Sequence, residues 1–467
     1  MLDYKIKIGL VPDVRNLGDF AVRKGIFEPA KGAERKNAVL KYIKENFEDE
    51  NTRFADLEWL NDLGVLYDNA DCGRVCSYLK KEKVDAIFII NCNFGNEEVC
   101  GRLAKEMNLP VLLWGPQDTE FEKDGMRYTD TQCGLFAISK QLRRYHVPFS
   151  YIENSCVDSD TFKEGFERFL AVVTMLKNFK SLSITQVGTR LTPFKSVMYN
   201  ELELTERFGF NINNCNLAQF KEKYDIVLLK KSKELEKMSS EIKLRYDIGS
   251  MTDEELVKLS AFVYAYIEVF EETDADIMAS ECWTAMPVAF GANPCLAMSI
   301  LYDMGIIVAC ESDIQGAITC ALLQCASRGK EVPLFGEFTT RHPENKNAEL
   351  LWHCGPFPYS AKAEGEGARL FNAKPSFRAK DGKYTIARFQ GDDGRYTLLG
   401  GEFKTAEGPY TFGTYLWAEF KDLSAIEKKL ICGPYIHHMT EMYGSYSETL
   451  EEFCKFVTGI EYDPIEN

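Results

Sequence analysis

Two carboxylates, Glu281 and Asp313, have the positions in the sequence that most strongly indicate chemistry. Each follows a short apolar run that is expected to form a strand of a parallel sheet. Because parallel strands end at the same edge of a sheet, both side chains are expected in one crevice. Carboxylate oxygens placed there could bind a hard divalent cation or transfer protons. The structural alternative is that they are helix N-caps or solvated strand ends, and Asp313 precedes an expected helix.

The histidines offer a third type of ligand. The chain has five, and two of them form the doublet His437-His438 near the C-terminus. One imidazole with two carboxylates makes a mixed nitrogen and oxygen site, which suits Mn²⁺ better than a tetrahedral sulfur site does. His353 follows an apolar run and could donate a hydrogen bond to a substrate oxygen. For each histidine the alternative is a surface position or a satisfied position in the core.

Arg190 ends another expected strand in the sequence Gly188-Thr189-Arg190. A guanidinium group there could bind a hydroxyl or an anionic group of a ligand; the alternative is an arginine on a surface loop. The sequence contains neither the glycine-rich patterns of nucleotide sites nor the GxSxG pattern of a hydrolase nucleophile. Nucleotide phosphates and serine hydrolysis are therefore disfavoured.

Alternating strands and helices are expected to position these side chains. In the first third, apolar runs such as 84–91 and 110–116 alternate with segments of helical length. A second unit has expected strands at 182–187, 225–229, 275–279 and 305–310. Thr252 and Glu255 have the spacing of a capping box, which predicts the start of a long helix. The pattern predicts two doubly wound α/β domains.

The pattern of apolar and polar residues changes near residue 370. Short alternating segments separated by Asp-Gly turns predict a small antiparallel β unit there. We therefore expect three domains, which are a Rossmann-like α/β domain at 1–157, a second α/β domain with the two carboxylates at 158–345, and a β-rich domain with the histidine doublet at 346–467.

The composition excludes several classes of protein. Among 467 residues, 55 are Lys or Arg and 71 are Asp or Glu, which gives a net charge of −16. This acid excess argues against a general binder of nucleic acid or of anionic membranes, and no apolar run is long enough to span a membrane. The 15 cysteines are odd in number and scattered, with no paired CxxC motif, so neither a disulfide scaffold nor zinc is indicated. With no visible secretory signal, a reducing cytoplasm is expected.

Eight motifs taken in order resemble the L-fucose isomerase/L-arabinose isomerase superfamily, most closely its bacterial fucose-isomerase-like branch. The similarity extends over nearly the whole chain, and the ordered set is specific although each motif alone is weak. The motifs are Asn-Cys-Asn-Phe-Gly at 91–95, Leu-Trp-Gly-Pro at 113–116, Asp-Thr-Gln-Cys-Gly at 130–134, Gly-Thr-Arg at 188–190, Ser-Glu-Cys-Trp at 280–283, Cys-Glu-Ser-Asp at 310–313, Trp-His-Cys-Gly at 352–355 and the doublet at 437–438.

The resemblance implies two α/β domains followed by a C-terminal domain with a β-barrel-like part. It also implies a Mn²⁺-dependent aldose–ketose isomerase that acts on a monosaccharide through a cis-enediol. The metal ligands would be Glu281, Asp313 and His438, because the family's ligand lies six residues before a glycine, as His438 lies before Gly444. Glu281 and Asp313 would also form the acid–base pair.

The resemblance further implies residues that contact the sugar and an assembly of several subunits. The expected substrate-binding residues are Arg190, Trp283, His353, His437, Asn93, Trp114 and Gln132. The family forms trimers and hexamers with active sites near subunit contacts, so first-domain residues such as Trp114 and Gln132 are expected to serve a neighbouring subunit.

The sugar itself is left open by the sequence. The candidates are L-fucose, L-arabinose, D-arabinose, or an anionic sugar such as a 6-deoxy-6-sulfo-hexose of the sulfoquinovose type. A non-catalytic sugar-binding protein is the alternative from a different class.

Overall fold

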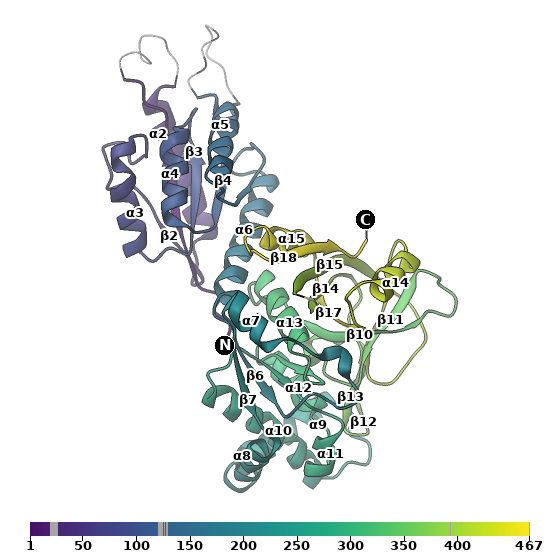
Figure 1. The fold of residues 1–467 in the computed structure, drawn as a ribbon. Helices are drawn as coiled ribbons and strands as arrows, with labels where there is room; N and C mark the ends of the chain where they lie inside the picture. Colours follow the sequence, from purple (N-terminus) through teal and green to yellow (C-terminus); the bar gives the residue numbers. More distant parts are fainter. Residues whose placement is uncertain (19–26, 120–124, 126, 128, 393, 467) are drawn as a thin grey trace. The chain divides into compact units, whose positions relative to one another are not determined.

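The computed structural model describes residues 1–18, 27–119, 125, 127, 129–392 and 394–466 (Figure 1). They form two compact units, one of Tyr4–Lys177 and one that combines Met1–Asp3 with Asn178–Asn467. The sequence predicts three domains with boundaries at 157/158 and 345/346, and these boundaries stay a prediction, because the division into two units does not test them. Among the described helices, none has both the length and the apolar character that crossing a bilayer requires.

The N-terminal unit contains a five-stranded sheet in the order β2-β1-β3-β4-β5, in which all neighbours are parallel. Every residue of β3 and β4 is buried, which explains their uninterrupted apolar sequences. The strands are β1 (Ile6–Asp13), β2 (Thr52–Ala55), β3 (Ala86–Asn91), β4 (Val111–Trp114) and β5 (Phe149–Tyr151). The helices are η1 (Asn69–Asp71), α2 (Pro29–Phe47), α3 (Cys72–Lys81), α4 (Glu97–Met107), α5 (Thr131–Arg144) and α6 (Asp160–Phe179), whose last turn contains the boundary between the units.

The second unit begins with a four-stranded parallel sheet in the order β7-β6-β8-β9. Its strands are β6 (Ser183–Val187), β7 (Asn211–Cys215), β8 (Ile277–Ser280) and β9 (Val308–Cys310). Its helices are η2 (Lys195–Val197), α7 (Glu201–Phe208), α8 (Leu217–Lys230), α9 (Ser232–Arg245), α10 (Asp253–Glu272), α11 (Ala285–Phe290), α12 (Cys295–Asp303) and α13 (Ile314–Ala326). The capping box predicted at Thr252 and Glu255 is confirmed at the start of α10.

The strand predicted at 225–229 is wrong, because these residues lie inside α8. This helix begins with a second capping box, in which Asn216 and Gln219 bond to each other's backbone N–H groups. The strand that pairs with β6 is β7 instead.

Six strands of a nine-stranded sheet close into an antiparallel barrel in the order β16-β11-β10-β17-β14-β15, with β15 pairing back to β16. The expected fold class, two α/β layers followed by a barrel-like β unit, is therefore confirmed. The barrel strands are β10 (Leu334–Arg341), β11 (Ala348–His353), β14 (Lys383–Asp392), β15 (Arg395–Ala406), β16 (Thr414–Glu419) and β17 (His438–Tyr443). Outside it lie β12 (Arg369–Phe371), β13 (Lys374–Arg378), β18 (Ile460–Pro464), η3 (Tyr359–Ala361), α14 (Leu423–Cys432) and α15 (Ser447–Cys454). The turn predicted between β14 and β15 includes Asp393, which lies outside the described residues.

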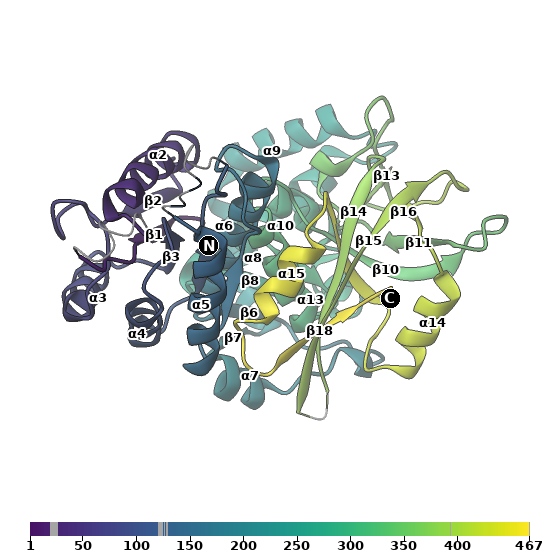
Figure 2. The same cartoon turned by 90° about the horizontal axis from the view of Figure 1, so that it is seen from above.

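Helix α13 joins the parallel sheet to the barrel (Figure 2). All of its residues are buried, and it contacts β8 and β9 on the sheet and β14 and β17 on the barrel. Small residues such as Gly316 and Ala317 allow this close approach. The N-terminal end of α13 therefore lies where the edge of the sheet meets the barrel strands.

In the N-terminal unit, the last residue of β1 is a buried acid. Asp13 accepts a 2.9 Å hydrogen bond at Oδ2 from the backbone N–H of Asn96, while its Oδ1 has no partner among the described residues. Burial raises the pKa of Asp13 to about 7, more than its hydrogen bonds lower it. The folded protein therefore binds this proton more tightly than the unfolded chain does.

We expect Asp13→Asn to make the protein less sensitive to alkaline pH. The protonated Asp13 stabilises the folded protein relative to the unfolded chain, because its pKa is higher in the folded state. This stabilisation is lost as the pH rises from about 4, the unfolded pKa, to about 7, the folded pKa. The difference of three pKa units corresponds to about 4 kcal/mol at most. Urea unfolding of both proteins at about pH 5 and about pH 8 measures the difference. The wild type should lose more stability than the variant between the two conditions, and an equal loss would contradict the assignment.

Candidate active site

His438, the first residue of β17, contacts a carboxylate through each of its ring nitrogens. Its Nδ1 lies 3.0 Å from Oδ2 of Asp313, and its Nε2 lies 3.1 Å from Oε2 of Glu311. Burial lowers the pKa of His438, but the hydrogen bonds with the two carboxylates outweigh burial and raise it to about 9. With no metal ion at Nε2, the fully buried imidazole is therefore a cation at neutral pH, held between two anions, and an ion that binds Nε2 would take the place of its proton.

Hydrogen-bond donors contact both carboxylate oxygens of Asp313. Its Oδ1 accepts a 2.9 Å hydrogen bond from the backbone N–H of Gly316, which makes it the N-cap of α13. The guanidinium group of Arg388, on barrel strand β14, binds both carboxylate oxygens, with Nη2 3.1 Å from Oδ1. Burial would raise the pKa of Asp313, but Arg388 and His438 hold it well below its usual range. Asp313 is therefore an N-cap, as the structural alternative expected, and it also contacts His438 of the histidine doublet.

The backbone between β9 and α13 is strained. Glu311 and Ser312 have φ angles of 64° and 57°, in the left-handed region that residues other than glycine seldom adopt. This turn allows Glu311 and Asp313, only two positions apart, to reach opposite nitrogens of one imidazole. Such strain persists where surrounding contacts over-determine it, and here the indole N–H of Trp283 donates a 2.8 Å hydrogen bond to Oε1 of Glu311.

A second carboxylate faces Nε2 of His438 from the neighbouring barrel strand. Glu337 of β10 is paired with His438 of β17 in the strand register. Its Oε2 lies 3.9 Å from Nε2 of His438 and 3.5 Å from Nε2 of His437. Burial raises the pKa of Glu337 to about 7. Burial, and then the charge of His438, lower the pKa of His437 to about 4, so His437 is neutral.

The donor atoms around His438 fit a divalent cation. Among the described residues, Glu311, His353 and His438 have ligand atoms within 4.8 Å of one another, and so do Glu337, His437 and His438. Oxygen and imidazole nitrogen donors suit Mn²⁺ and similar ions. A carboxylate on the second nitrogen of a metal-binding histidine is a common arrangement, and Asp313 provides it at Nδ1. The side of His438 open to an ion is therefore Nε2.

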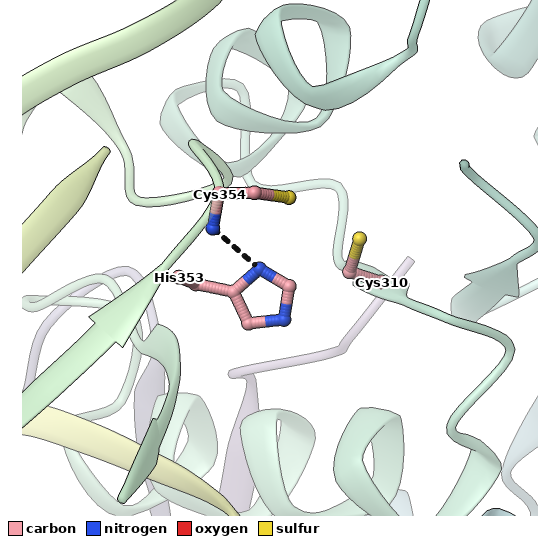
Figure 3. A group of neighbouring side chains, drawn as sticks. All are labelled: Cys310, His353 and Cys354. Carbon is pink, nitrogen blue, oxygen red and sulfur yellow. Dashed lines mark hydrogen bonds between the residues drawn. The ribbon is translucent and has the colours of Figure 1, made fainter. Parts of the chain in front are cut away.

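His353 at the end of β11 is placed as a hydrogen-bond donor. Its Nδ1 accepts a 2.9 Å hydrogen bond from the backbone N–H of Cys354 (Figure 3). A neutral imidazole that accepts at Nδ1 carries its proton on Nε2. In the described part of the chain this buried Nε2 has no partner. It can donate to an oxygen of a ligand near His438, and its role toward a sugar stays a prediction.

Glu281 is buried among a different set of donors. Its Oε1 accepts from the Thr284 hydroxyl at 2.7 Å and from the backbone N–H of Ala285 at 3.2 Å, and its Oε2 accepts from the backbone N–H of Thr189 at 3.2 Å. The structure thus brings Asp313 and His438 together, while Glu281 is not in either group of ligand atoms around His438. Its assignment as a ligand and an acid–base group stays a prediction.

A loop after β6 forms an aromatic wall beside the histidines. Nη1 of Arg190 donates to the backbone carbonyls of Leu191 and Phe194, at 2.9 and 3.1 Å, and so shapes this loop. The ring of Phe194 lies 5.7 Å from that of Trp283 and 5.9 Å from that of His437. Trp283 and His437 are each about two-fifths exposed, at 40% and 37%, so they face the solvent side of the site.

The three predicted substrate residues of the first domain lie in the N-terminal unit. Asn93 is buried and accepts from the backbone N–H of Gly95 at 2.9 Å. Trp114 is buried, with its indole N–H donating to the Ser155 hydroxyl at 3.2 Å. Gln132 is exposed on α5. Of the three, Gln132 is therefore the one presented at the surface, and their roles toward a sugar stay predictions.

Known sugar isomerases are similar in sequence to this chain. Residues 18–180 match a family model described as the N-terminal domain of fucose/sulfoquinovose isomerase. A sulfoquinovose isomerase from Priestia aryabhattai is 26% identical over 391 residues, which are 81% of this chain and 85% of that protein. Another, from Alkalicoccus urumqiensis, is 26% identical over 324 residues, 68% of this chain and 71% of that protein. The chain is thus similar to fucose/sulfoquinovose isomerases over most of its length.

The motifs predict an aldose–ketose sugar isomerase, and the similarity to these sugar isomerases confirms that prediction. A solved solute-binding protein of an ABC transporter from Agrobacterium vitis, with bound D-fucose, aligns at 11% identity over 59% of this chain and 76% of that one. Its TM-score of 0.13 is too low to relate the two folds.

Three residues of this fucose-isomerase-like site were not predicted from the sequence. Glu311 is adjacent to a predicted strand end and could have been considered with Asp313. Glu337 and Arg388 lie on barrel strands, and their approach to His438 and Asp313 depends on strand register, which no local signal in the sequence reveals.

We expect Arg388→Leu to destabilise the protein by about 3–5 kcal/mol, because it leaves the buried Asp313 carboxylate without its cation. Chemical denaturation measures the loss, and adding Asp313→Asn should restore part of it. The matched control is Arg341→Leu, which breaks the exposed ion pair with Glu427 and should cost less than about 1 kcal/mol. Equal losses in the two arginine variants would show that the buried pair has no special role.

Proposed function

We propose that this sugar isomerase binds one divalent cation, preferably Mn²⁺, with Glu311, Glu337 and Nε2 of His438, and that its substrate is sulfoquinovose or a closely related 6-sulfonated aldose. The metal proposal rests on one observation, that Nε2 of His438 faces two carboxylates while Asp313 holds its Nδ1. The relatives named sulfoquinovose isomerase support the substrate.

The chain's own residues would prepare the site for the sugar. Asp313 fixes the imidazole of His438 through Nδ1, and Trp283 fixes Glu311. His353 offers an N–H to a sugar oxygen. A divalent cation, when bound, supplies electrostatic stabilisation for the negative charge that develops on two adjacent sugar oxygens.

Isomerisation also requires a proton to move between C1 and C2, which a carboxylate next to the sugar can transfer. Asp313 has partners on both oxygens, so we infer that it positions His438 instead of exchanging protons itself. Glu281 is fixed by one side-chain hydroxyl and two backbone N–H groups. It stays our proposed acid–base residue.

Removal of the metal should abolish turnover. Dialysis against a chelator should inactivate the enzyme, and Mn²⁺ should restore it. Glu311→Gln and Glu337→Gln should lose bound Mn²⁺ together with activity, since each removes a negative ligand. Glu281→Gln should retain Mn²⁺ while its turnover falls by about 10²–10⁴-fold.

Metal content and rate measured on the same samples separate these outcomes. Glu349→Gln is the matched control, because Glu349 is also a buried barrel glutamate but lies on β11 near Arg341. If Glu311→Gln and Glu337→Gln keep wild-type Mn²⁺, the ligand assignment is wrong.

The substrate is tested with a panel of aldoses in the presence of Mn²⁺. We expect kcat/KM for sulfoquinovose to exceed that for L-fucose, L-arabinose and D-arabinose by at least about 100-fold, because a site built for a charged group discriminates strongly against sugars that lack it. The ketose formed is the measured product. Turnover confined to the neutral sugars would overturn the sulfonated substrate and leave the isomerase assignment in place.

A further inference from the structure

Two cysteines and a glutamate meet where α3 packs against α4 in the N-terminal unit. Cys72 is the first residue of α3, and Cys76 lies one turn later on the same face of that helix. Glu106 is in the last turn of α4. Among the described residues, one ligand atom from each of the three lies within 4.8 Å of the other two. The group shares no residue with the candidate active site.

The thiol of Cys76 is directed at the carboxylate. Its Sγ donates a 3.3 Å hydrogen bond to Oε2 of Glu106. Both cysteines are buried free thiols, whereas Glu106 is exposed. The alternative is that the cysteines are only small apolar side chains, since both belong to the hydrophobic core of the N-terminal unit. An apolar role does not account for a carboxylate held against one of the thiols.

The spacing of the three ligand atoms fits one tetrahedral ion. With Zn–S of about 2.3 Å and Zn–O of about 2.0 Å, a sulfur and an oxygen ligand lie about 3.5 Å apart and two sulfurs about 3.8 Å apart. The distance of 3.3 Å between Cys76 and Glu106 is close to the first value. The other two pairs of ligand atoms are at most 4.8 Å apart. The largest adjustment is therefore about 1.3 Å, which rotation of the exposed Glu106 side chain can provide.

The surroundings favour a soft cation with one coordination position open to water. Cys72 lies at the N-terminus of α3, where the helix dipole favours a thiolate. Arg102, one turn before Glu106 on α4, carries a positive charge next to these anionic ligands. Burial, and then the hydrogen bond with Glu106, raise the pKa of Cys76 to about 12, so the ion must displace a proton, as cations with high affinity for sulfur do. Because Glu106 is at the surface, water can occupy the fourth position.

We propose that Cys72, Cys76 and Glu106 bind one soft divalent cation, with zinc the best match and a water molecule as the fourth ligand. The bound ion would link the start of α3 to the end of α4 and so stabilise the packing of these two helices. The sequence shows no paired CxxC motif here, because two of the ligands are a full helical turn apart and the third comes from another helix.

The test uses Co²⁺ as a spectroscopic probe of thiolate ligands in the full-length chain, purified with a phosphine reductant. A sulfur-to-cobalt charge-transfer band is expected in the wild type, and it should be lost in Cys72→Ser and in Cys76→Ser. Glu106→Gln changes an exposed side chain, so it should fold like the wild type and bind Co²⁺ at least about tenfold more weakly. Zinc added afterwards should remove the band from the wild type.

Three controls separate this site from other cysteines and from the proposed Mn²⁺ site. Cys325→Ser changes a buried cysteine outside the group, Cys354→Ser changes a cysteine next to His353, and both should keep the band. Glu311→Gln should also keep it, so failure of the Mn²⁺ site leaves this result unchanged. Circular dichroism shows whether each variant is folded. A wild type without the band, a band that persists in folded Cys76→Ser, a band lost in folded Cys354→Ser, or unchanged Co²⁺ affinity in Glu106→Gln would each overturn the proposal.

Discussion

A buried ion pair, Asp313 with Arg388, is the interaction on which the rest of the site depends. Both side chains are 1% exposed. Removing two charges from water is costly, and it is tolerated only where hydrogen bonds satisfy both groups. Asp313 meets that condition by capping α13 and by bonding to His438 as well as to Arg388. One carboxylate thereby ties a helix, two barrel strands and the imidazole together.

This arrangement determines which atoms remain available for a ligand. Because Asp313 occupies Nδ1 of His438, only Nε2 can face an ion, and the turn after β9 and the register of β10 with β17 bring Glu311 and Glu337 to it. The candidate site thus lies where the parallel sheet meets the barrel.

The sequence predicted the architecture better than the details of the site. The spacing of apolar residues and the helix-capping residues predicted the alternation of strands and helices, and the capping box predicted at Thr252 is present. The run at 225–229 was misassigned because a short apolar segment fits a strand and a helix equally well. Asp313 was indicated by its position after a predicted strand, whereas His438 was chosen from the histidine doublet by the family resemblance. Glu337 could not, because its approach depends on strand register, which local sequence does not specify.

The most direct test of the central claim is anomalous diffraction from crystals grown with Mn²⁺, recorded on both sides of the manganese absorption edge. We expect one manganese ion bound to Nε2 of His438 and to carboxylate oxygens of Glu311 and Glu337, with the Asp313–Arg388 pair intact. An ion bound instead by Glu281 and Asp313, or the absence of an ion from His438, would contradict this assignment.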